Sequence, residues 1–416
     1  MSFKSLVLSR IIAFITDQDR RDKRADKFEA KRKRAGDPHE VIFFHDVTDP
    51  YSHILLLALP DVIKDTDIKL TCHLVNEPKD DVVPERVMLS DYALKDAQVL
   101  ATRAGFKCKL IPPSDQQVKK VRSAIAAAFV ENDIRTACNI SKALWSDENI
   151  PDSEYHWQQS QSEGTAILTK LGHYMGGMLY YGGEWYWGLD RLHYLETRLR
   201  SVGALTKSDT FPMPSVPAST GKVHGRLHMY FSFRSPYSYI ALQRAIALTD
   251  AYGVELKLRF VLPMVMRGLP VPKSKRLYIV NDVAREAKRL GLPFGRIVDP
   301  LGKAVERGYA LMPWAREQGQ DIRLAQNFST AVSSQGIDAT TDKGLRRIVE
   351  TAGLSWDESK EKLLIDEWSA EAEINRQELT NHSLWGVPSF RFEDKCVWGQ
   401  DRMWLIEEWF QDKNRE

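Results

Sequence analysis

The chain has 416 residues, enough for two or three domains of ordinary size. With 43% hydrophobic and 27% charged residues its composition is that of a folded protein, and its net charge of +2 gives the whole chain no attraction to nucleic acid or to an anionic membrane. The cysteines, Cys72, Cys108, Cys138 and Cys396, form no C-x-x-C pair, which excludes a dithiol redox motif and a cysteine zinc site. Scattered free cysteines predict a reducing, cytoplasmic setting.

The first 36 residues are predicted to form a charged amphipathic helix outside the rest of the fold. Their apolar stretch, Leu6–Ile15, is interrupted by Ser9 and Arg10 and is too short to cross a membrane, which takes about 20 residues. A dense mixture of charges follows over Asp17–Arg34. Two interpretations stay open: the helix packs on the body or self-associates, or it is a peripheral membrane anchor with basic residues.

Two motifs occur twice in the same order. The sequence Asp49–Ser52 (D-P-Y-S) returns as Ser235–Ser238 (S-P-Y-S), and the W-G-x-D-R pattern of Trp187–Arg191 returns at Trp398–Arg402. This order indicates a duplicated unit.

The boundaries of the two units follow from a stretch rich in Pro, Ser, Thr and Gly at 206–223, which is typical of a linker. The domains are therefore predicted at 37–205 and 224–416, after the helix at 1–36. Each unit is predicted to run β-α-β, helical insert, β-β-α, which gives an α/β sheet with helices on its faces. The predicted leading strands are Val41–Val47, Ile68–Val75, Leu227–Phe233 and Val254–Leu262.

Ser235 and Asp49 occupy the same place before the proline of the repeated motif. Either residue is a favoured helix N-cap and proline is a favoured first helical residue, so capping alone accounts for both. The alternative is that the Ser235 hydroxyl, among free N–H groups at a helix N-terminus, donates a hydrogen bond to an anion such as a thiolate.

A carboxylate at this place has the opposite effect on a thiolate. At about 4 Å its repulsion costs about 1 kcal/mol in water and about 4 kcal/mol at an effective dielectric constant of 20. A helix terminus returns only about 0.3–1 kcal/mol. Asp49 is therefore predicted to raise the pKa of a bound thiol, so the first unit should not activate one.

Val387 and Pro388 stand just before a predicted strand. A trans proline at a strand start is unremarkable, whereas a cis bond would leave the Val387 backbone free to pair with an extended, peptide-like ligand. Met178 lies near the equivalent place in the first unit, where a cis bond would be costly, so this platform is predicted to be absent there.

Two further positions have a structural and a functional interpretation. Asp401 can cap the last helix, or Gln400 and Asp401 can bind the ammonium and carboxylate of a ligand. Lys275 belongs either to a solvated basic loop or to an anion site. Leu89 falls at the place that corresponds to Lys275 in the first unit, which therefore lacks this cation.

Together these motifs resemble the kappa-class glutathione transferases and the bacterial 2-hydroxychromene-2-carboxylate isomerases, members of the DsbA-like thioredoxin-fold group. The resemblance rests on Phe231–Leu242, Lys275–Pro293, Gly386–Phe390 and Trp398–Arg402, and it covers most of the second unit and the first in outline. It implies two tandem thioredoxin-like domains, each with a helical insertion, and glutathione as the cofactor.

The resemblance also implies site residues. Ser235 would stabilise the glutathione thiolate, Val387 before a cis Pro388 would pair with the cysteinyl backbone, Gln400 and Asp401 would hold the γ-glutamyl end, and Lys275 the glycine carboxylate. The thiolate would add reversibly to an activated double bond of a small electrophile, as in an isomerase, or stay on the product, as in a transferase. The short loop Met266–Lys275 departs from the family pattern.

Two other functions are weighed against this one. A non-catalytic thioredoxin-fold binding or scaffold protein is favoured by Asp49 and the short loop, and opposed by Ser235, Lys275, Pro388 and Asp401 occurring together. A disulfide oxidoreductase is opposed by the missing C-x-x-C pair. The first unit is predicted to be a packing partner or a separate binding module.

Overall fold

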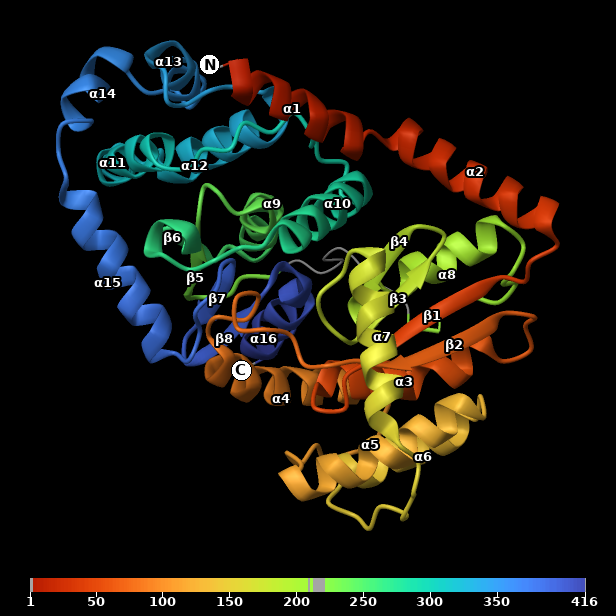
Figure 1. Cartoon of the computed structure of the whole chain (residues 1–416). Coiled ribbons are helices and arrows are strands. Elements are labelled where there is room, and N and C mark those ends of the chain that lie inside the picture. Colours follow the sequence, from red (N-terminus) through yellow and green to blue (C-terminus); the bar gives the residue numbers. More distant parts are fainter. Residues whose placement is uncertain (1–2, 209, 212–220, 416) are drawn as a thin grey trace. The chain divides into compact units, whose positions relative to one another are not determined.

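The computed structural model describes residues 3–208, 210–211 and 221–415 (Figure 1). Contacts divide the chain into two compact units. The N-terminal unit comprises Asp22–Met213, and the C-terminal unit comprises Pro214–Glu416 together with Met1–Arg21. Most of the predicted linker at 206–223 lies outside the described residues, so the domain boundaries remain a prediction.

Two helices form the start of the chain, α1 (Phe3–Thr16) and α2 (Gln18–Ala35). Asp17 separates them because it acts as the first cap of α2: its side chain accepts the Arg20 N–H at 3.0 Å and its carbonyl accepts the Arg21 N–H at 3.0 Å. The apolar stretch and the charged run of the sequence are thus consecutive helices. In the described part of the chain, no helix combines the length and the apolar character needed to cross a membrane.

Each unit contains a four-stranded mixed sheet of the same topology. The strands are β1 (Glu40–His45), β2 (Lys69–Leu74), β3 (Met178–Tyr181) and β4 (Glu184–Trp187) in one unit, and β5 (Arg226–Phe231), β6 (Glu255–Phe260), β7 (Ser389–Phe392) and β8 (Lys395–Trp398) in the other. Their orders, β2-β1-β3-β4 and β6-β5-β7-β8, correspond strand by strand. In both, the first two strands are parallel and the remaining pairs antiparallel. The predicted β-α-β, insert, β-β-α order is confirmed.

The helices of the N-terminal unit surround its sheet and form its insertion. They are α3 (Pro50–Ile63), α4 (Arg86–Arg103), α5 (Asp115–Val130), α6 (Ile134–Trp145), α7 (Trp157–Leu171), the short η1 (Leu189–Arg191) and α8 (Leu192–Ser201). The insertion, α4 to α6, lies between β2 and α7.

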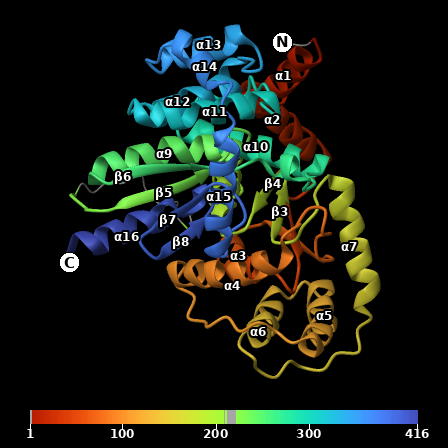
Figure 2. The same ribbon diagram turned by 90° about the vertical axis from the view of Figure 1, so that its left-hand side faces the viewer.

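The C-terminal unit has the longer insertion. Its helices are α9 (Pro236–Tyr252), η2 (Met264–Arg267), α10 (Lys273–Arg289), α11 (Lys303–Glu317), α12 (Asp321–Thr330), η3 (Ala331–Gln335), α13 (Asp342–Thr351), α14 (Trp356–Lys362), α15 (Glu367–Asn381), η4 (Gln400–Arg402) and α16 (Met403–Arg415). Figure 2 shows α11 to α14 grouped on one side of this sheet, with α9 between them and the strands. The chain is an α/β protein with two thioredoxin-like domains that carry helical insertions.

One continuous apolar core joins the C-terminal sheet to its insertion. Phe233, just after β5, stacks on Phe328 of α12 with ring centroids 4.1 Å apart and lies 5.2 Å from the ring of Tyr309. Gly308 fits between these rings because a Cβ there would lie 2.8 Å from both Phe233 and Phe328. This packing fixes the segment that leads from β5 to the start of α9.

Candidate functional site

Ser235 is the N-cap of α9, as its sequence context predicts. Its N–H donates to the Ser232 carbonyl at 3.0 Å, and its Oγ accepts the Ser238 N–H at 3.1 Å. Pro236 is the first helical residue. The hydroxyl oxygen is therefore held at the positive end of the helix by backbone bonds, while the side chain remains half-buried rather than enclosed.

The backbone of Val387 lies beside this hydroxyl. The Val387–Pro388 peptide bond is cis. The Ser235 hydroxyl reaches the Val387 carbonyl at 3.4 Å, which is long for an O–H···O hydrogen bond and therefore weak. Among the described residues nothing accepts the Val387 N–H. Ser235 and Val387 thus meet at one point, each with hydrogen-bonding capacity that the chain leaves largely unused.

Gln400 and Asp401 lie together in η4, at the start of the last helical segment. Gln400 is only 1% exposed, and its side-chain oxygen and carbonyl both accept from Arg244 of α9 at 2.6 Å. Its amide nitrogen donates to the Asp401 carboxylate and lies 3.4 Å from the Glu286 carboxylate. The Gln400 side chain is therefore fully engaged within the protein, where it orients Asp401. A direct contact between Gln400 and a ligand remains a prediction.

Lys275 lies in the first turn of α10, so the basic run Lys273–Arg276 belongs to a helix and not to a loop. Burial lowers the pKa of Lys275 below its ordinary value, because desolvation penalises the charged ammonium. An anion bound beside it would favour the charged form again. Lys275 in α10, Ser235 at the start of α9 and Asp401 in η4 lie on three separate elements. Of the predicted site residues, Ser235 and Val387 are brought into contact.

Two contacts that the sequence did not reveal tie the start of α9 to the insertion. The Tyr237 hydroxyl donates to Asp282 of α10 at 2.7 Å. Arg234 forms a bidentate ion pair with Asp299 at 2.8 and 2.9 Å. The tyrosine of the repeated P-Y-S motif was the available signal for the first contact, whereas Arg234 has no counterpart in the repeat.

The C-terminal unit combines a four-stranded mixed sheet, a capped helix after the first strand and a cis proline before the third strand. The family model described as a DSBA-like thioredoxin domain matches residues 226–411. The C-terminal half is a DsbA-like thioredoxin domain.

Relatives of the DsbA-like domain are distant isomerases. The 2-hydroxychromene-2-carboxylate isomerase of Pseudomonas putida is 25% identical over 191 residues, which cover 43% of this chain and 90% of that protein. The enzyme of the same name from Sphingobium xenophagum is 25% identical over 198 residues, 45% of this chain and 98% of its own. These matches cover less than half of this chain.

Solved structures overlap with this chain over a similar length. A structure of 2-hydroxychromene-2-carboxylate isomerase is 22% identical and covers 45% of this chain and 95% of its own, with a TM-score of 0.40. The cytosolic disulfide reductase DsbM from Pseudomonas aeruginosa, solved with glutathione, is 16% identical and covers 46% of this chain and all 100% of its own, with a TM-score of 0.36.

The N-terminal unit builds the same junction with a different cap. Both carboxylate oxygens of Asp49 accept backbone N–H groups, from Tyr51 and Ser52, each at 3.1 Å. The Tyr51 hydroxyl donates to Asp96 at 2.8 Å, as Tyr237 of the DsbA-like domain donates to its own insertion. Asp96 and Asp282 therefore hold equivalent places in the two insertions, which agrees with the alignment of Leu89 with Lys275.

The third residue of P-Y-S also has one role in both units. The Ser52 hydroxyl accepts the Asp46 N–H at 3.1 Å, and the Ser238 hydroxyl accepts the Ser232 N–H at 3.3 Å. All four groups are buried. The serine thus closes the end of the first strand against the helix in each unit.

Two carboxyl groups replace two hydroxyls in the N-terminal unit. Asp46 and Asp49 stand where the DsbA-like domain has Ser232 and Ser235. Burial, reinforced by the charge of Asp46, raises the pKa of Asp49 from 3.8 to about 7. Burial also raises the pKa of Asp46 to about 6. Burial thus disfavours the ionised form of both carboxyl groups, and an ionised thiolate at this place would meet the same penalty.

The strand register corrects the predicted equivalence of Met178. Met178 pairs with Phe44 of β1, whereas Ser389 pairs with the corresponding Tyr230 of β5, so Met178 matches Ser389. Gly177 is the residue that matches Pro388, and its N–H donates to the Phe44 carbonyl at 2.9 Å. The prediction was wrong by one position because a strand start without a proline gives no fixed point for alignment.

In the N-terminal unit, the two residues that precede β3 are both glycines, Gly176 and Gly177; the two residues before the third strand are called the strand entry of each unit. Gly176 matches Val387, and a Cβ on Gly176 would lie 2.5 Å from the Cβ of Asp46. Gly177 has a φ of +66°, and its Cβ would lie 3.0 Å from the Asp49 carboxylate. The two aspartates therefore fill the space in which the DsbA-like domain presents its Val387 backbone to the Ser235 hydroxyl.

Proposed function

We propose that the DsbA-like domain is a glutathione-dependent isomerase or transferase that acts on a small electrophilic molecule. The observation that carries the proposal is the meeting of the Ser235 hydroxyl with the Val387 backbone at the N-terminus of α9. The names of its distant relatives, which are isomerases, support the same class.

The groups present fit a peptide-like thiol. The Val387 N–H, which nothing in the described chain accepts, and its weakly engaged carbonyl form a donor and acceptor pair for an extended backbone. Asp401, oriented by Gln400, is an anion suited to an ammonium group, and Lys275 is a cation suited to a carboxylate. When bound, glutathione supplies a thiol whose thiolate form is a strong nucleophile.

The work of the chain is to hold that thiol in its ionised form. The 3.4 Å contact between the Ser235 hydroxyl and the Val387 carbonyl is weak, so the hydroxyl is free to donate its proton to a thiolate. A hydrogen bond to the ionised form and the positive end of α9 both lower a thiol pKa. Tyr237 and Arg234, through Asp282 and Asp299, keep the start of α9 in place.

Calorimetric titration of glutathione into the full chain tests this proposal. The wild type should bind with a dissociation constant in the millimolar range or below. Asp401→Ala and Ser235→Ala should each weaken binding about tenfold, because each removes one charge-assisted contact worth about 1.5 kcal/mol.

Asp49→Ala is the matched control, since it removes the equivalent cap of the N-terminal unit. It should leave the affinity unchanged. No heat of binding in the wild type at millimolar glutathione would sink the proposal and favour a non-catalytic binding protein. An equal loss in Asp49→Ala and Asp401→Ala would show that the wrong unit has been assigned the site.

We infer that the N-terminal unit is a non-catalytic partner of the DsbA-like domain. The acid pair Asp46 and Asp49 and the glycines at 176 and 177 occupy the place of the thiol site. The variant Asp49→Ala should therefore turn over an electrophile at the wild-type rate.

A further inference from the structure

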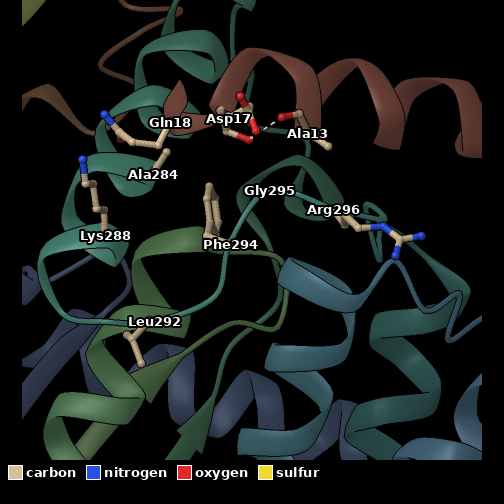
Figure 3. A pocket seen from close by; sticks show the side chains of 10 residues that line it. Ala13, Asp17, Gln18, Ala284, Lys288, Leu292, Phe294, Gly295 and Arg296 are labelled. Atoms are coloured by element: carbon tan, nitrogen blue, oxygen red, sulfur yellow. Dashed lines mark hydrogen bonds between the residues drawn. The ribbon is translucent and has the colours of Figure 1, made fainter. Parts of the chain in front are cut away.

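One face of helix α1 is seated on the C-terminal unit. Ser9 and Thr16 of this face are buried. The fit is close, because a Cβ on Gly295 would lie 2.5 Å from the Thr16 hydroxyl oxygen. Figure 3 shows the last turn of α1, with Ala13, crossing over the segment that carries Phe294 and Gly295. The seated face holds α1 in a fixed orientation on the unit.

The opposite face of α1 is apolar and uncovered. Its side chains, at helical spacings of three and four residues, are Val7, Leu8, Ile11 and Phe14, with exposed fractions of 39%, 49%, 49% and 57%. They are four of the 13 large hydrophobic side chains that stand exposed in the described part of the chain, and they share one 14-residue helix. Large apolar side chains that stand exposed together on one helix mark an interaction surface, so this face is suited to a partner.

The segment that begins with α1 is basic in sequence. Residues 1–36 carry 11 Lys and Arg against 5 Asp and Glu, a net charge of +6, whereas the remaining chain carries 47 against 51, a net charge of −4. Arg10 of α1 is exposed, and the Arg20 guanidinium lies 3.9 Å from the centre of the exposed Phe14 ring. Arg20 therefore borders the apolar face, where it also pairs with Asp17 at 4.0 Å, and Arg10 is a second exposed cation on α1.

We propose that α1 lies in the surface of an anionic lipid bilayer, with Val7, Ile11 and Phe14 at the boundary of headgroups and acyl chains. Apolar side chains flanked by Lys and Arg are the composition that binds in the plane of such a surface. Each basic residue near an anionic leaflet adds attraction that depends on ionic strength. A second copy of the chain fits less well, because it would bring two segments of net charge +6 together.

Vesicle flotation with the full chain tests the proposal. The protein should float with phosphatidylcholine vesicles that contain roughly one third phosphatidylserine, and at least about tenfold less with phosphatidylcholine alone or at high salt. The double variant Ile11→Glu, Phe14→Glu places charges in the apolar face and should lose at least about tenfold of the bound fraction.

The control variant is Ile374→Glu, an exposed apolar residue of α15 in the same unit with 61% exposure, which should float like the wild type. Thermal unfolding of the variants should match the wild type, because all three side chains are exposed. Failure of the wild type to float with anionic vesicles, or equal flotation with both lipids, would overturn the proposal. So would a dimer in sedimentation velocity that the double variant dissociates, since a second copy would then cover the face.

Discussion

The two units of this chain solve the same structural problem with two different caps. Tyr51 and Tyr237 make the same bond to their insertions, so the repeated motif serves the fold in both units. Asp49 and Ser235 both accept backbone N–H groups at the helix start. Only Ser235 also carries a proton that it can donate at every pH. Folding needs only a cap that accepts hydrogen bonds, which both residues provide. Stabilising a thiolate needs a hydrogen-bond donor, which Ser235 alone provides, so the two units differ in the chemistry they can support.

The strand entry beside the cap differs in the same way. The DsbA-like domain presents Val387 and a cis Pro388 there, whereas the N-terminal unit has Gly176 and Gly177 against its acid pair. The differences are therefore coupled: one unit leaves a backbone free beside a hydroxyl, and the other fills the space with carboxylates.

The largest expected effect comes from copying Val387 into the other unit. Gly176→Val places a Cβ 2.5 Å from the Asp46 Cβ and 2.8 Å from the Asp46 nitrogen, so backbone must move. We expect the free energy of unfolding of the N-terminal unit to fall by about 3 kcal/mol. Urea denaturation measures this, and the reverse exchange Val387→Gly should cost no more than about 1 kcal/mol. Equal costs would show that the two strand entries are not differently packed.

The next effect compares the serines of the repeated motif. Ser52→Ala and Ser238→Ala each leave a buried backbone N–H without an acceptor, and Ser52→Ala also breaks a 2.8 Å hydrogen bond with His45. We expect a loss of about 2–3 kcal/mol for Ser52→Ala and about 1 kcal/mol for Ser238→Ala. Denaturant midpoints at constant slope provide the measurement. A larger loss for Ser238→Ala than for Ser52→Ala would contradict the equivalent role of the two hydroxyls as acceptors at the end of the first strand.

A smaller effect depends on pH. The pKa of Asp49 is raised from 3.8 to about 7 in the folded protein, so the folded state keeps a proton that the unfolded state loses. The unfolding free energy of the wild type therefore falls as pH rises between these two values and is level above them. Asp49→Asn cannot ionise, so its unfolding free energy should not fall as pH rises through this range, although its amide keeps only one of the two oxygens that accept the Tyr51 and Ser52 N–H groups.

Asp133→Asn is the matched control for the sign of this effect. Asp133 is also an N-cap in the N-terminal unit, but hydrogen bonds from Thr136 lower its pKa. Its contribution is present at neutral pH and lost on acidification, so Asp133→Asn should destabilise at neutral pH. Thermal unfolding of the two variants across pH separates the signs, and a stabilising Asp133→Asn would invalidate the argument.

Much of the fold could be predicted because the repeated motifs combine local signals with a duplication. The P-Y-S cap, the leading strands and the W-G-x-D-R turn appear twice, so each copy supports the other. The match of Met178 with the proline was wrong because pairing register, rather than local pattern, decides it. The side chain of Gln400 points into the protein because Arg244, distant in sequence, binds it, and no local pattern predicts such a partner.

The most direct measurement is the pKa of the glutathione thiol when bound, followed through the ultraviolet absorbance of the thiolate. In the wild type and in Asp49→Ser the bound thiol should ionise below the free value of about 8.5. In Ser235→Asp its pKa should rise by about 1–3 units, because a carboxylate replaces the hydroxyl donor. The same low pKa in Ser235→Asp as in the wild type would contradict the account.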